Sequence, residues 1–124
     1  MEFSSRYNTP EVNEAIIELA RWYNEKGTDF APIFKAQFLG RDPNALAINQ
    51  HRRVLNRYYV DIAKAYRIGV LDRRFAIMAA DHPGARIWKQ VVCPMTIALH
   101  GHEMAASLVT LSALMPKFGD GAIY

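Results

Sequence analysis

One stretch of the chain, residues 42–68, places the strongest constraint on the fold. Asp42 followed by Pro43 is typical of a helix start, because aspartate caps the first turn and proline fits the first helical position. Gly69 follows the stretch, and glycine commonly ends a helix. The apolar side chains between these limits recur every three or four residues, namely Ile48, Leu55, Tyr58, Tyr59, Ile62 and Tyr66. This pattern predicts a long helix over about 43–68.

Proline and glycine divide the rest of the chain into shorter segments, and we find no sustained alternation of apolar and polar residues. The segments with helical spacing are 10–26, 29–39, 72–81, 85–99 and 102–115. Asp29 and Asp72 are expected to cap two of these helices. Pro94 is expected to kink a third, since proline lacks a backbone donor. The sequence therefore predicts an all-α protein, a compact bundle of five to six helices with one long central helix.

Length and composition favour one globular domain over residues 1–124, with loose tails at 1–8 and 117–124. The single cysteine, Cys93, excludes an intrachain disulfide, and no secretory signal is visible. No apolar run is long enough for a transmembrane segment. We therefore expect a cytoplasmic protein in which Cys93 is a buried structural thiol.

The middle of the chain contains a set of motifs that occur together. They are the pair Leu55-Asn56, the aromatic Tyr58, the pair Ile62-Ala63, the run Gly69-Val70-Leu71-Asp72, and Trp88 further on. This arrangement resembles a family of small bacterial all-helical domains of unknown function, and the resemblance implies a helical fold but no activity. Beside the apolar stripe, Asn56 is expected to bond to another helix or to a loop carbonyl. After Gly69, a helix corner is expected at which Val70 and Leu71 enter the core.

Basic residues concentrate in residues 31–74, which hold nine bases and three acids. Four of them lie on one face of the long predicted helix: Arg53, Arg57, Lys64 and Arg67. Arg52, Arg73 and Arg74 are placed to extend this basic face. Such a face is able to bind phosphates or nucleic acid. The alternatives are a solvated face, a face neutralised by the acidic first helix, and a surface for an acidic protein partner.

Two further groups of residues are candidate sites. His100 and Glu103 are three residues apart and share a helix face, so they are the candidate metal ligands. No established metal-ligand spacing surrounds them, which favours a polar helix junction, and we expect no cofactor. The aromatic side chains Trp22, Tyr58, Tyr59, Tyr66 and Trp88 are interpreted as core residues, with a ligand pocket as the alternative.

The sequence contains no catalytic triad order, phosphate-binding loop, dinucleotide fingerprint or paired cysteine motif. We therefore interpret the protein as a non-catalytic helical interaction module, either an accessory subunit of a larger assembly or a homo-oligomer, although an enzyme is not excluded. The candidate interface lies in the nearly uncharged segment 105–115 and comprises Leu108, Leu111 and Met115. The alternative function is anion or nucleic-acid binding by the basic face.

Overall fold

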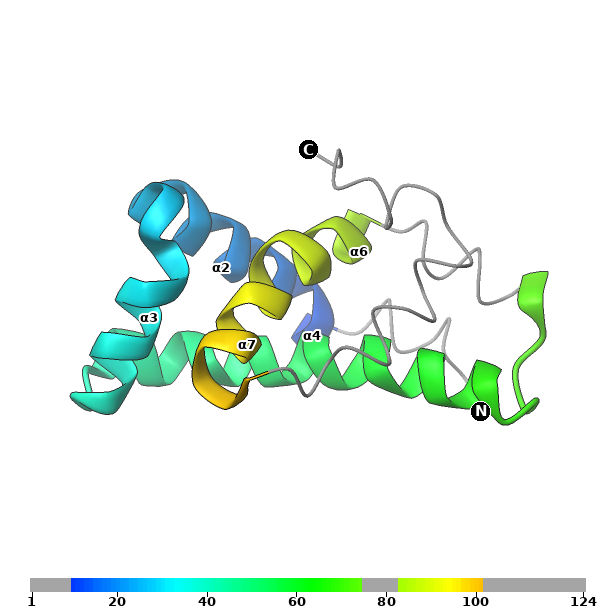
Figure 1. Cartoon of the computed structure of the whole chain (residues 1–124). Coiled ribbons are helices and arrows are strands. Elements are labelled where there is room, and N and C mark those ends of the chain that lie inside the picture. The colour runs from blue at the N-terminus through cyan, green and yellow to red at the C-terminus, as the bar shows by residue number, and fades with distance from the viewer. Residues whose placement is uncertain (1–9, 75–82, 102–124) are drawn as a thin grey trace.

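The computed structural model describes residues 10–74 and 83–101, and all regular secondary structure in these ranges is helical (Figure 1). Three helices follow one another in the first range: α2 (Pro10–Lys26), α3 (Phe30–Leu39) and α4 (Pro43–Arg67). The second range is one continuous helical segment made of α6 (Pro83–Ile87), the π-helical turn η2 (Trp88–Val92) and α7 (Cys93–His100). The prediction of an all-α protein is confirmed.

The predicted bundle of five to six helices is wrong. In the described ranges only α2, α3 and α4 reach ten residues. The segment expected to form a kinked helix over 85–99 is continuous, but the π-helical turn η2 divides it into two short α-helical pieces. The helix expected over 102–115 and most of that expected over 72–81 lie outside the described residues, as do the expected tails.

Both ends of α4 agree with the sequence patterns that predicted them. The Asp42 carboxylate accepts hydrogen bonds from the backbone N–H groups of Asn44 at 2.8 Å and Ala45 at 3.4 Å. At the other end, Gly69 has a φ of 81° and its N–H donates to the carbonyl of Tyr66. The next N–H, that of Val70, donates to the carbonyl of Ala65 at 2.9 Å. This pair of bonds is a Schellman motif, which needs a left-handed residue at the glycine position.

Replacing Gly69 with alanine is expected to lower the free energy of unfolding by about 1 kcal/mol, because a Cβ atom disfavours the left-handed conformation. Apart from the two chain neighbours, no atom of the described residues lies within 4 Å of that Cβ, so the loss would come from the backbone conformation. Gly40 is the matched control, since its φ of −82° is acceptable to alanine. Urea denaturation of both variants checks the prediction, and equal stabilities would contradict it.

The connection between α2 and α3 differs from the expected aspartate cap. A 3₁₀ turn, η1 (Gly27–Asp29), leads directly from α2 into α3, and the Phe30 N–H donates to the Gly27 carbonyl. The Asp29 side chain makes no capping hydrogen bond. The 3₁₀ turn thus satisfies the first N–H group of α3 through the backbone, without a contribution from the Asp29 carboxylate.

The core lies between α4 and the helices that pack against it. In Figure 1, α4 runs along one side of the molecule, with α3 near its first turns and α2 and the α6–α7 segment crossing it further along. The largest fully buried side chains come from all of these elements: Leu19, Phe34, Leu55, Tyr58, Tyr59, Ile62, Trp88, Val91, Val92 and Met95. The interpretation of the aromatic side chains as core residues is thereby confirmed for Tyr58, Tyr59 and Trp88. The expectation for Val70 is wrong, because its side chain is 63% exposed beyond the end of α4.

The π-helical turn η2 lies immediately before the proline that was expected to kink this segment. In η2 the Cys93 N–H donates to the Trp88 carbonyl, five residues earlier. The ring of Pro94 would clash with the carbonyl of residue 90 in a regular α-helix. A wider turn ahead of the proline relieves that clash, so the irregularity begins one turn before Pro94.

Cys93 is buried, as the sequence predicted, with 3% of its surface exposed. Burial raises the pKa of its thiol to about 12, and the nearby charge of Lys89 offsets only part of this effect. A thiol that does not ionise is a poor nucleophile and a poor metal ligand. Cys93 therefore belongs to the core.

The raised pKa of Cys93 predicts a loss of stability in alkali. The pKa of the thiol is 9.0 when unperturbed but about 12 in the folded protein, so rising pH favours the unfolded state. The contribution is complete below about pH 9 and falls by about 1 kcal/mol at pH 10. Urea unfolding at pH 7 and pH 10 measures it, with Cys93→Ala as the control for other titrating groups. A parallel decline in both proteins would contradict the prediction.

Candidate anion-binding site

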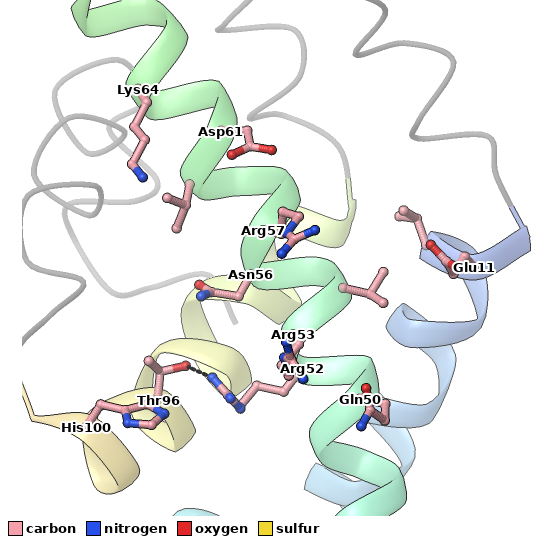
Figure 2. A pocket seen from close by; sticks show the side chains of 13 residues that line it. Glu11, Gln50, Arg52, Arg53, Asn56, Arg57, Asp61, Lys64, Thr96 and His100 are labelled. Atoms are coloured by element: carbon pink, nitrogen blue, oxygen red, sulfur yellow. Dashed lines mark hydrogen bonds between the residues drawn. The ribbon is translucent and has the colours of Figure 1, made fainter.

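An open groove of about 600 Å³ runs along α4 between the start of α2 and α7 (Figure 2). Glu11 and Val12 at the start of α2 border it on one side, and Thr96 and His100 of α7 border it on the other. The α4 side chains that line the groove are Gln50, Arg52, Arg53, Val54, Asn56, Arg57, Val60, Asp61 and Lys64. Four bases and two acids therefore line it, which gives the groove a positive balance.

Arg52 is the most unusual side chain of the groove, because only 5% of its surface is exposed. Its Nε donates to the Asn49 side-chain oxygen at 2.8 Å, and one terminal nitrogen donates to the Thr96 hydroxyl at 2.9 Å. Both acceptors are neutral, and no carboxylate in the described ranges forms an ion pair with Arg52. Desolvation, and then repulsion from Arg53, lower the pKa of the Arg52 guanidinium. The groove thus contains a buried positive charge whose described partners carry no negative charge.

Asn56 adds a second hydrogen-bond donor one helical turn from Arg52. Its side-chain oxygen accepts a bond of 3.1 Å from the indole N–H of Trp88, as expected for a bond to another helical segment. Since an indole N–H only donates, this bond fixes the amide orientation and leaves the Asn56 NH₂ group as a donor at the groove. Residues four apart share one face of a helix, so Arg52 and Asn56 present their donors side by side.

Three of the four residues of the predicted basic face line the groove. Arg53, Arg57 and Lys64 form no ion pair within the residues that the structure describes. The expected neutralisation by the acidic first helix is not seen among these residues: Glu11 reaches the groove without pairing, and Glu18 pairs with Arg21 of its own helix at 2.6 Å. The groove therefore has the donors and the charge needed to bind an oxyanion.

Arg67, the fourth residue of the predicted basic face, is exposed near the end of α4 and does not line the groove. Arg73 and Arg74 are exposed as well and also lie apart from the groove lining.

Only one of the two candidate metal ligands lies within the described residues. His100 lies at the exposed end of α7 beside the groove, whereas Glu103 is outside the described residues. Across residues 10–74 and 83–101, no three histidine, cysteine or acidic side chains gather in a way that suits a metal ion. The proposed interface residues Leu108, Leu111 and Met115 also lie outside the described ranges, so both hypotheses stay predictions.

Sequence reasoning missed two members of the site and misjudged a third. Asn49 and Thr96 carry no motif, and Thr96 meets Arg52 only because the chain brings together positions 44 residues apart. Arg52 was expected to extend an exposed face, whereas it is buried between α4 and α7.

Comparisons with known proteins add no assignment to this geometry. Neither a family model, nor a curated protein, nor a solved structure matches the chain. Within the described part of the chain, every helix is too short or too polar to cross a membrane.

Proposed function

We propose that this protein is a helical domain that binds a small oxyanion in the groove along α4, with Arg52 as the principal contact. The supporting observation is the burial of the Arg52 guanidinium against neutral acceptors only. Removing a charge from water costs several kcal/mol, and neutral hydrogen bonds recover only part of that cost. A bound oxyanion would supply the missing negative charge and accept the remaining guanidinium N–H groups.

The neighbouring donors favour an anion over any other ligand class. Arg52 and Asn56 offer only N–H groups to the groove, and Asn49 holds the guanidinium by its Nε. Arginine binds carboxylates and phosphates through paired N–H groups, which is a geometry that lysine does not reproduce. The site therefore suits a planar carboxylate or a tetrahedral phosphate or sulfate.

The test is a calorimetric titration with inorganic phosphate and with sulfate at constant ionic strength. We expect Arg52→Gln to weaken binding by about 10- to 100-fold, as loss of a charged hydrogen bond does. Arg67→Gln is the matched control, because it removes an arginine of the same helix that lies outside the groove lining. Equal affinities of the two variants, or no binding by the unaltered protein, would overturn the proposal.

The interaction module predicted from the sequence stays a second proposed function. Its residues Leu108, Leu111 and Met115 lie outside the described ranges, and it does not conflict with anion binding. Light scattering of the purified protein tests the homo-oligomer, and a pull-down of the native protein from its own cells tests the accessory subunit. A monomer without a stoichiometric partner would contradict both.

A further inference from the structure

We propose that the ligand is a small non-aromatic molecule with at least two anionic groups, one held by Arg52, Asn56 and Thr96 and the other by Arg53 and Arg57. This inference rests on the proposed anion-binding function and adds the chemical class of the ligand. Phosphorylated and carboxylated molecules share this chemistry.

The groove contains two adjacent sets of donors. The inner set, Arg52 and Asn56, faces α7 and contacts Thr96 and Trp88. The outer set, Arg53 and Arg57, begins one residue later on the same helix, so it is rotated by roughly 100° toward solvent. Both sets repeat at a spacing of four residues, and they run side by side along α4. One anionic group on each set would match this arrangement.

The outer set also forms no described ion pair, although the carboxylates of Glu11 and Asp61 line the same groove. Like charges four residues apart on a helix repel each other, and Arg53 additionally repels the buried Arg52. Neither Arg53 nor Arg57 forms an ion pair within the described ranges. A single monovalent anion on Arg52 would leave Arg53 and Arg57 without an ion-paired partner in the described ranges, whereas a ligand with two anionic groups would pair with both sets.

The size and lining of the groove favour a small ligand over a nucleic acid. Its volume of about 600 Å³ falls within the range of small-molecule sites. No phenylalanine, tyrosine or tryptophan of the described residues lines it, since Tyr58, Tyr59 and Trp88 are fully buried, and its one aromatic ring is the His100 imidazole. Single-stranded nucleic acids are usually held by bases stacked on aromatic rings. The apolar lining consists of valines, Val12, Val54 and Val60, which suit a compact aliphatic or inorganic ligand.

The experiment compares inorganic phosphate, tripolyphosphate, citrate and a short single-stranded DNA by calorimetry at one ionic strength. We expect tripolyphosphate or citrate to bind at least about tenfold more tightly than phosphate, because two sets of donors act together. Arg57→Gln should remove most of that advantage and leave phosphate affinity within about twofold. Arg52→Gln should weaken all ligands, and Arg67→Gln should change none.

The possible results distinguish failure of this inference from failure of the proposed function. If tripolyphosphate and citrate bind no more tightly than phosphate, the ligand is a simple anion and only the inference fails. If the DNA binds most tightly and Arg67→Gln weakens it, the face binds a polymer and the inference fails as well. If none of the four binds, the proposed function fails too. A tenfold preference for either small polyanion that depends on both Arg52 and Arg57 supports the inference.

Discussion

Replacing Trp88 with alanine is expected to lower the free energy of unfolding by about 3–5 kcal/mol, as for other buried large-to-small changes. Trp88 is fully buried and stacks on Tyr59, with ring centroids 5.5 Å apart and planes inclined by 29°. It is also the residue through which the α6–α7 segment bonds to Asn56 of α4. A domain of this size is stable by about 5–15 kcal/mol, so this single change would remove a large share. Urea denaturation followed by circular dichroism measures the loss.

A second variant separates packing from the orientation of Asn56. Trp88→Phe keeps an aromatic ring in the core but loses the indole N–H, so we expect a smaller loss of stability, about 1–2 kcal/mol. It should also weaken anion binding, because the Asn56 amide loses the bond that orients its NH₂ group. Trp22→Phe is the matched control: its indole N–H donates to the Phe30 carbonyl at 3.3 Å, outside the groove lining. If both variants bind phosphate equally well, Trp88 does not position Asn56.

The parts of the fold that the sequence predicts correctly depend on local interactions. The start of α4 follows from Asp42 and Pro43, and its end follows from Gly69, because capping involves only residues within a few positions. The number and continuity of the later helices depend on packing and on how Pro94 is accommodated. A π-helical turn is one of several ways to avoid the steric clash of a proline within a helix, and the sequence does not indicate which of them is used.

The candidate site was predictable in part from the sequence. The burial of Arg52, which the sequence analysis did not predict, can be inferred from the spacing of the core residues of α4. Ile48, Leu55 and Tyr59 define the buried stripe of α4, and position 52 falls within the same three-to-four spacing. Arg52 has basic neighbours in the sequence, but the periodicity places it at the edge of the core. A charged residue at a core position deserves to be treated as a site candidate. Its partner Thr96 comes from a distant segment, so no local pattern identifies it.

The substitution Arg52→Met removes the buried charge but keeps a long side chain. Two effects oppose each other in the ligand-free protein: the desolvation cost of the charge disappears, and the bonds to Asn49 and Thr96 are lost. We expect them to offset, so that the free energy of unfolding stays within about 1 kcal/mol of the unaltered protein. Urea unfolding without added anion measures this difference.

A much larger difference between this variant and the unaltered protein is expected when phosphate is added. An anion present at 100 times its Kd should raise the free energy of unfolding of the unaltered protein by about 2.7 kcal/mol. The methionine variant should gain almost nothing, because the group that binds the anion is gone. A strongly destabilised variant that still responds fully to phosphate would show that Arg52 only joins α4 to α7. A stable variant that no longer responds would show that the buried charge serves the ligand, since the fold does not need it.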